Sequence, residues 1–93
     1  MLNNKNIFSK KKILIYGLGK SGQSAFKNLK KENEIYIYDD KKIDNNIGVK
    51  KNLINYHKII KKNFDFIIIS PGININKCKL TSFLKKNKKK NSY

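Results

Sequence analysis

Arginine and tryptophan are absent from this sequence of 93 residues, and cysteine, proline, histidine and methionine each occur once. Because Cys78 is alone, no internal disulfide can form, which fits a reducing compartment. Apolar runs such as residues 66–69 are far shorter than the ~20 residues needed to span a bilayer. The first residues also lack the apolar core of a signal peptide. We therefore expect a cytoplasmic protein with no membrane partner.

The absence of arginine also affects whether the positive charge indicates a nucleic-acid partner. All 22 basic residues are lysine, against six acidic residues, and the net charge is +16. Lysine, asparagine and isoleucine are abundant and have A/T-rich codons, so part of this charge reflects genome composition. Specific readers of nucleic acid use the planar fork of arginine to recognise guanine and to stack on bases. We expect no specific nucleic-acid partner, only nonspecific binding to polyanions.

Signals of catalysis are missing as well. Residues 19–21, Gly-Lys-Ser, match the end of an ATP-binding P-loop, but that pattern requires a glycine five residues earlier, where Leu14 stands. His57 and Cys78 have no partners at the spacing of metal ligands or of a nucleophile and its base. The sequence predicts no catalytic residue, no metal site and no cofactor held by this chain.

What is present is an alternation of strand and helix patterns. β-Branched apolar runs, each closed by glycine, acidic residues or Pro-Gly, alternate with segments whose apolar residues recur at helical spacing. A polar loop with a turn at Gly48 occupies residues 41–52. The pattern predicts strands over residues 12–17, 34–40 and 64–70, and helices through residues 20–33, within 53–63 and through 77–89.

Three strands alternating with helices predict an α/β fold, a single small Rossmann-like domain with a parallel sheet and helices on both faces. We place this domain at residues 11–87, after a polar N-terminal segment (1–10) and before a polar tail (88–93). The apolar faces expected to pack on the sheet are Ala25, Phe26 and Leu29 in the first helix, Leu53, Tyr56 and Ile60 in the second, and Leu80, Phe83 and Leu84 in the third.

The strongest candidate site is the turn after the first strand, where Gly17, Gly19 and Gly22 spell G-x-G-x-x-G between a strand and a helix. In such turns the first glycine allows a tight bend, the second lets a phosphate approach the backbone and the third lets helix and strand pack closely. The helix N-terminus behind them attracts anions. Lys20 and Ser21 would add a cation and a hydroxyl, although Ser21 also suits a helix N-cap.

Two more loops meet this turn, because parallel strands finish at the same edge of a sheet. Asp39 stands 22 residues after Gly17, where a carboxylate can accept hydrogen bonds from a sugar or base, and Asp40 and Lys41 follow it. The alternative role of the two acids is turn formation. Ser70, Pro71 and Gly72 place a rigid bend and an exposed backbone at the same edge.

The segments "KKILIYGLGKSGQSAFKNLKK", "IYIYDD" and "DFIIISPGI" together resemble the N-terminal domain of the Mur ligases. Within that family the match is to the D-glutamate-adding ligases of peptidoglycan synthesis, and it covers roughly residues 11–86. The pairing of G-x-G-x-S-G with a downstream S-P-G-I is much more specific than either motif alone.

The resemblance implies a Rossmann-like domain that binds the UDP end of UDP-N-acetylmuramoyl-L-alanine rather than NAD. It implies that Lys20 and Ser21 face the diphosphate and that Gly72 lines the same pocket. Asp39, with its neighbours Asp40 and Lys41, would face the uridine.

The family's chemistry uses ATP and Mg²⁺ in a central ATPase domain, followed by a C-terminal domain. Neither is recognisable in these residues, so the resemblance implies a chain that binds substrate and lacks the ligase domains that complete the enzyme. At the lysine run 88–90 we expect either a shifted reading frame or a truncation. Two alternatives stay open: a free-standing NAD(H)- or nucleotide-binding module, and a basic scaffold associated with nucleic acid.

Overall fold

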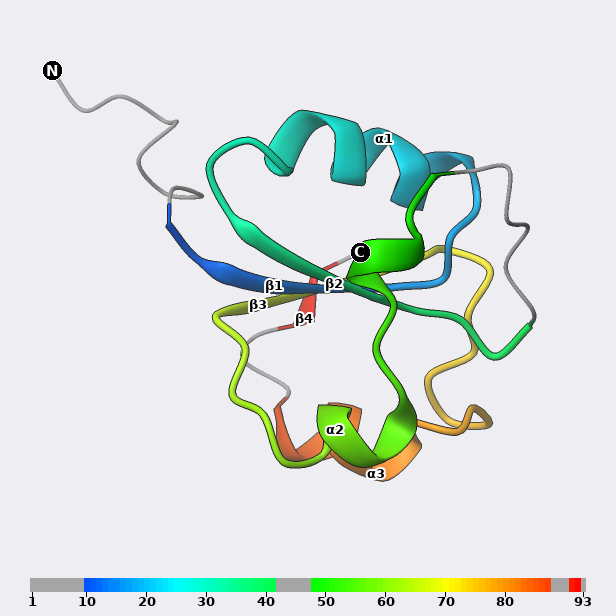
Figure 1. The fold of residues 1–93 in the computed structure, drawn as a ribbon. Helices are drawn as coiled ribbons and strands as arrows, with labels where there is room; N and C mark the ends of the chain where they lie inside the picture. The colour runs from blue at the N-terminus through cyan, green and yellow to red at the C-terminus, as the bar shows by residue number, and fades with distance from the viewer. Residues whose placement is uncertain (1–9, 42–47, 88–90, 93) are drawn as a thin grey trace, which may run out of the picture.

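A computed structural model of the chain describes residues 10–41, 48–87 and 91–92. Its sheet has the strand order β2-β1-β3-β4, and every pairing is parallel. This confirms the predicted Rossmann-like α/β fold. The elements (Figure 1) are β1 (Lys12–Tyr16), α1 (Lys20–Leu29), β2 (Glu34–Tyr38), the 3₁₀ helix η3 (Lys50–Asn52), α2 (Tyr56–Ile59), β3 (Phe66–Ile69), α3 (Thr81–Lys86) and β4 (Asn91–Ser92).

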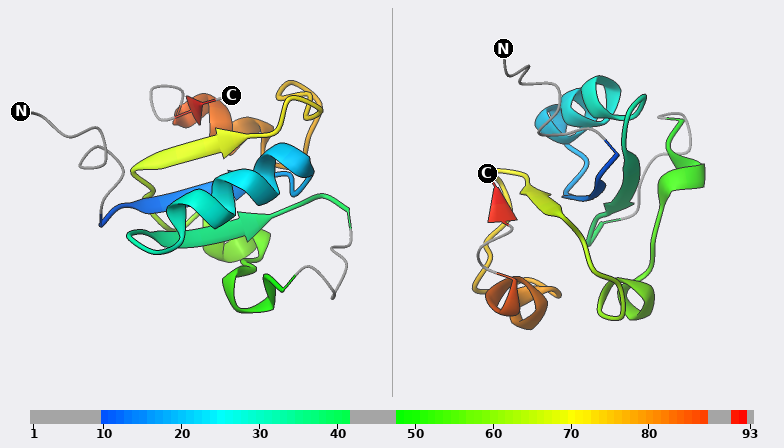
Figure 2. Two further views of the ribbon diagram at one scale, coloured as in Figure 1. Left: turned by 90° about the horizontal axis from the view of Figure 1, so that it is seen from above. Right: turned by 90° about the vertical axis from the view of Figure 1, so that its left-hand side faces the viewer.

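The helices cover both faces of the sheet. Figures 1 and 2 show α1 on one face and α2 with α3 on the other. Because successive side chains of a strand point to opposite faces, β1 divides its apolar residues between the two layers. Leu14 and Tyr16 point toward α2 and α3, whereas Ile13 and Ile15 point toward α1.

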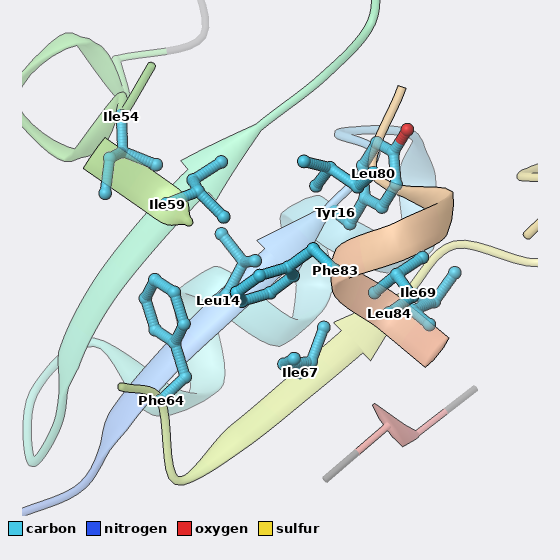
Figure 3. Close-up of a cluster of buried hydrophobic side chains, with 10 residues drawn as sticks. All are labelled: Leu14, Tyr16, Ile54, Ile59, Phe64, Ile67, Ile69, Leu80, Phe83 and Leu84. Atoms are coloured by element: carbon cyan, nitrogen blue, oxygen red, sulfur yellow. The ribbon is translucent and has the colours of Figure 1, made fainter. Parts of the chain in front are cut away.

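The larger core lies on the α2 and α3 face (Figure 3). Phe64 stands in it with its ring centroid 6.2 Å from that of Phe83, edge to face. Each fully buried side chain of this size contributes roughly 1.5–3 kcal/mol to folding. The cluster consists of Leu14, Tyr16, Ile54, Ile59, Phe64, Ile67, Ile69, Leu80, Phe83 and Leu84.

A smaller core lies under α1. Ile13, Ile15, Ile35 and Ile37 project from β1 and β2, and Leu18 and Val49 complete the cluster. Ala25, Phe26 and Leu29 of α1 pack against it, as their helical spacing predicts. The inward face of the last helix is confirmed too, since Leu80, Phe83 and Leu84 are buried.

The predicted apolar face of the second helix is wrong. Leu53, Tyr56 and Ile60 are 45%, 38% and 46% exposed, and the buried residues of this segment are Ile54 and Ile59. The reason is that α2 is a single turn, so helical periodicity does not extend back to residue 53. Leu53 is extended and bridges Ile37, and the Ile54 N–H donates to the Ile37 carbonyl at 3.0 Å. The segment therefore lines the free edge of β2 before it turns into α2.

Other boundaries are tighter than predicted. β1 and β2 end at Tyr16 and Tyr38, and the last helix begins at Thr81. The loop expected over residues 41–52 contains η3, and residues 42–47 lie outside the described residues. Of the expected tail, Asn91 and Ser92 pair with Ile67 and Ile68 as β4. Among the described residues no helix is both long enough and apolar enough to cross a membrane.

Candidate functional site

The loops that follow β1, β2 and β3 meet at one edge of the sheet, here called the carboxyl edge. Backbone hydrogen bonds extend past the strand ends into these loops. The Gly17 N–H donates to the Tyr38 carbonyl at 2.8 Å, and the Ser70 N–H donates to the Tyr16 carbonyl at 2.9 Å. The turn after β1 is thereby held on both sides by its neighbours.

Two glycines of this turn are required by the chain itself. Gly17 has φ +93°, and a Cβ there would lie 2.7 Å from the Cβ of Ser70. A Cβ on Gly22 would lie 2.3 Å from the Gly17 carbonyl oxygen. Both positions therefore exclude any side chain. Gly17 does so because of its positive φ and the nearby Ser70, and Gly22 because a Cβ would meet the Gly17 carbonyl.

Gly19 differs from the other two. It is exposed, its φ and ψ are −82° and −165°, and a Cβ there would meet only the Ser70 hydroxyl at 3.9 Å. Any residue could adopt this conformation. Gly19 is also the N-cap of α1, a position that favours serine, threonine, asparagine or aspartate. Nothing in the described chain explains a glycine here.

The N-terminus of α1 is open as a result. No side chain of the described residues caps it, and its first turn contains no acidic residue. The first N–H groups of a helix lack partners within the helix and carry partial positive charge. Lys20 and Ser21 stand in this first turn, exposed, and neither side chain is hydrogen-bonded to another described residue. This end of α1 can therefore hold an anion.

A cleft of about 290 Å³ lies beside the glycine turn, between α1 and the end of β3. It brings together Gly17, Ser21, Gly22, Ser70 and Pro71 over an apolar floor of Ile15, Ile68 and Ile69. Gly19, Lys20, Asp39, Asp40, Lys41 and Gly72 are not among the residues that line it. Ser70 and Ile73 close the Pro71–Gly72 bend with a hydrogen bond of 3.0 Å.

The two acidic residues after β2 are already engaged. Asp39 accepts from the Leu18 N–H through Oδ2 at 2.8 Å and from the Lys41 N–H through Oδ1 at 3.0 Å. Asp40 accepts from the Tyr16 hydroxyl at 2.7 Å. The predicted uridine contacts thus also serve as internal acceptors of the two loops, while the Lys41 side chain is exposed.

Tyr16 is a residue of this edge that the sequence analysis did not single out. It is fully buried, and its ring centroid lies 5.6 Å from that of Tyr38. Burial first, then hydrogen bonding to Cys78 and Asp40, raises the pKa of Tyr16 well above its usual range. Its position as the last residue of a buried strand was the available signal, because a tyrosine there carries its hydroxyl to the sheet edge.

The opposite edge, where the strands begin, is here called the amino edge. An open hollow of about 480 Å³ is lined there by Lys12, Lys58, Lys61, Lys62 and Asn63. The Lys62 ammonium stands 4.6 Å from the Tyr36 ring centroid and 3.3 Å from its hydroxyl. Four lysines line this hollow, but among the described residues no glycine turn faces it.

The described residues do not fit ATP or Mg²⁺. Leu14, which replaces the first glycine of a P-loop, lies inside β1 and is fully buried. Across the part of the chain that the structure describes, no three histidine, cysteine or acidic side chains gather where they could hold a metal ion.

These features define a class: a Rossmann-like α/β domain whose glycine turn leaves a helix N-terminus open to an anion. Comparison with known proteins makes the relationship more specific, although no protein-family model matches the chain. Three relatives each align with 73% of this chain. All are called UDP-N-acetylmuramoylalanine--D-glutamate ligase, and they come from Rickettsia prowazekii (35% identical), Rickettsia felis (33%) and Rickettsia conorii (34%).

The chain is therefore homologous to part of a Mur ligase, which confirms the resemblance seen in its motifs. The alignments span only 14 to 16% of the length of these relatives.

Proposed function

We propose that residues 11–87 form the UDP-substrate-binding N-terminal domain of a D-glutamate-adding Mur ligase. The ligand is UDP-N-acetylmuramoyl-L-alanine, and this chain supplies binding rather than chemistry. Homology to part of three D-glutamate ligases supports the family, and the geometry of the glycine turn supports the choice of a phosphorylated ligand.

The observation that carries this proposal is Gly19. The chain's own packing accounts for Gly17 and Gly22 but leaves Gly19 unexplained, at a helix N-cap where a polar side chain would stabilise the helix. A diphosphate against the first turn of α1 accounts for the absence of that side chain. Its oxygens accept the N–H bonds that a cap would otherwise accept, and a Cβ would reduce the room for them.

This placement of the diphosphate also gives roles to the other predicted site residues. Lys20 and Ser21 bind the diphosphate by charge and by hydroxyl donation, and Gly17 and Gly22 fix the turn that presents them. The uridine extends from there toward Asp39, Asp40 and Lys41. Ser70, Pro71 and Gly72 form the opposite wall.

On this proposal the whole ligase acts in the cytoplasm in peptidoglycan synthesis, and so contributes to cell shape and division. The whole ligase would use ATP and Mg²⁺ to join D-glutamate to the substrate, and residues other than those described would hold both groups. No step of that reaction is assigned to the residues described here, because they fit neither group. The role of this chain is to bind and orient the nucleotide end of the substrate.

A thermal melt of the full chain tests the proposal. A ligand that binds only the folded state raises its stability by about 2.7 kcal/mol at one hundred times Kd. We expect the melting temperature to rise with millimolar UDP-N-acetylmuramoyl-L-alanine and to stay unchanged with NADH. No shift with the UDP-sugar would contradict the proposal, and a shift with NADH alone would favour a free-standing dinucleotide-binding module.

Two lysine variants provide a matched control for the melt, since both make the same change in net charge. Lys20→Gln removes a cation beside the open helix end, and Lys58→Gln removes one at the amino edge. We expect the ligand-induced shift to shrink only in Lys20→Gln. Equal losses in both variants would show nonspecific attraction to a basic chain.

A further inference from the structure

Two consecutive carboxylates at the end of β2 bind the two residues that flank Gly17. Asp39 accepts from the Leu18 N–H at 2.8 Å, across 21 residues of sequence, and Asp40 accepts from the Tyr16 hydroxyl at 2.7 Å. The Gly17 N–H between them donates to the Tyr38 carbonyl at 2.8 Å. The end of β2 therefore binds three successive residues of the β1 strand and its turn.

The bond to Leu18 sets the geometry of the glycine turn. Leu18 is only 7% exposed, with its side chain in the core under α1, so side chain and backbone N–H are both fixed. The next residue is Gly19, the N-cap from which α1 begins. Holding the Leu18 N–H thus holds the peptide that leads into the open helix end.

Asp39 binds backbone N–H groups of two loops through its two carboxylate oxygens. Its second oxygen accepts from the Lys41 N–H at 3.0 Å, which bends the loop after β2 back on itself. Hydrogen bonds from N–H groups to a carboxylate are charge-assisted and stronger than neutral ones. A carboxylate also retains further acceptor positions, but its place is determined by the two backbone groups that it already binds.

We propose that Asp39 and Asp40 are positioning residues that hold the phosphate-binding turn preformed in the ligand-free chain, and that Asp39 acts on the ligand through this turn. The inference rests on the proposed function for the identity of the ligand. It revises the expectation that Asp39 is chiefly an acceptor for the sugar or base, and it gives the buried Tyr16 a role as the anchor of Asp40.

Two probes distinguish positioning from direct contact, namely UDP and inorganic diphosphate. If Asp39 contacts the uridine, Asp39→Asn weakens the binding of UDP and leaves the binding of diphosphate unchanged. If Asp39 positions the turn, the affinities for both probes fall by the same factor, since both probes bind at the open helix end. Charge alone predicts the opposite result, because removing a carboxylate should improve the binding of an anion.

The experiment compares Asp39→Asn with Asp65→Asn, a matched control whose carboxylate accepts from the Lys12 N–H at 2.8 Å at the other edge. An asparagine has one acceptor oxygen and an NH₂ group, so it cannot accept both N–H bonds of Asp39. In the ligand-free Asp39→Asn chain we expect Leu18 amide exchange to accelerate about tenfold, as the loss of one charge-assisted bond implies. Exchange at the core residue Ile67 should keep its rate, and Asp65→Asn should change neither amide.

Calorimetry completes the test. We expect UDP and diphosphate to lose about the same tenfold in affinity for Asp39→Asn. Unchanged exchange at Leu18, or a loss confined to UDP, would overturn the proposal. If the wild-type chain bound neither probe, the proposed function would fail, while Leu18 exchange would still decide whether Asp39 holds the turn.

Tyr16→Phe provides a second variant should Asp39→Asn unfold. It keeps the buried ring and removes the hydroxyl that Asp40 and Cys78 contact. We expect a smaller change in the same direction, with faster exchange at Gly17 and Leu18 and equal weakening of both probes. Wild-type exchange and wild-type affinities in this variant would exclude Asp40 and Tyr16 from the positioning role.

Discussion

The two edges of the sheet present positive charge in different ways. At the amino edge Lys12, Lys58, Lys61 and Lys62 surround an open hollow, and their ammonium groups extend on flexible stems. At the carboxyl edge the glycine turn presents a helix N-terminus with no side-chain cap, fixed by hydrogen bonds from β2. Only the second arrangement fixes its donors before a ligand arrives, so we place the proposed site there by geometry rather than by the density of charge.

The same contrast applies to the acidic residues. Asp39 and Asp40 accept hydrogen bonds from groups of the carboxyl edge, whereas Asp65 at the amino edge accepts from the first residue of β1. In a chain with a net charge of +16, lysine clusters are expected on any surface. A specific site therefore has to be recognised by its backbone.

The largest test of this comparison is Gly22→Ala. A Cβ would stand 2.3 Å from the Gly17 carbonyl oxygen, so α1 has to move away from β1. Such overpacking costs about 1–3 kcal/mol or more, a large part of the stability of so small a domain. We expect this loss in chemical denaturation, together with loss of UDP binding. Gly72→Ala is the control for stability, since no neighbouring atom lies within 4 Å of its added Cβ and the loss of stability should be small.

Gly19→Ser separates stability from binding. A serine N-cap would accept an N–H bond of the first turn and stabilise α1 by a few tenths of a kcal/mol relative to glycine. The same hydroxyl would compete with a phosphate, so we expect UDP affinity to fall about tenfold, or 1.4 kcal/mol. Denaturation and calorimetry on one sample provide both values. Tighter UDP binding in this variant would place the phosphate elsewhere.

Two tyrosine variants compare the edges at alkaline pH. A hydrogen bond to Glu34 raises the pKa of Tyr36 to about 12, and burial raises that of Tyr16 further. Above the ordinary tyrosine pKa of about 10 the unfolded chain loses protons that the folded chain keeps, so stability falls as pH rises. We expect Tyr16→Phe to lessen this fall more than Tyr36→Phe does, because Tyr16 is fully buried. Denaturation midpoints between pH 9 and about 12 provide the measurement, and identical curves for both variants would contradict the ranking.

The smallest effect is expected at the amino edge. Replacing Lys58 and Lys61 together by glutamine removes two cations from the hollow and leaves the glycine turn intact. We expect UDP affinity to change less than about twofold at physiological salt, because screening weakens charges more than about 8 Å away. Calorimetry in low and in physiological salt checks this. A tenfold loss at physiological salt would make the lysine hollow part of the binding site.

The strands and the glycine turn could be predicted because their signals are local. A β-branched run ended by glycine, as in residues 12–17, needs no information from the rest of the chain. The helical face of Ala25, Phe26 and Leu29 is likewise predicted from local sequence alone. The segment 53–60 has a helical spacing too, but pairing of Leu53 with Ile37 keeps its first residues extended, and the helix begins only at Tyr56. Tertiary pairing overrode the periodicity there.

The internal bonds of the site could not be predicted in the same way. The bond from Leu18 to Asp39 depends on the register of β1 against β2, which places Tyr16 opposite Tyr38. The difference between Gly19 and its two neighbouring glycines likewise appears only when each Cβ position is compared with its surroundings. A motif identifies three glycines, and the packing shows which of them the fold requires.

The most direct test of the central claim is an amide-resolved NMR titration of the full chain with UDP-N-acetylmuramoyl-L-alanine. We predict that the largest shift changes fall on residues 17–22, with smaller ones at residues 39–41 and at Ser70 and Gly72. The amides of Lys58, Lys61 and Lys62 should not move. Saturating changes centred on the amino edge, or none at the glycine turn, would contradict the account.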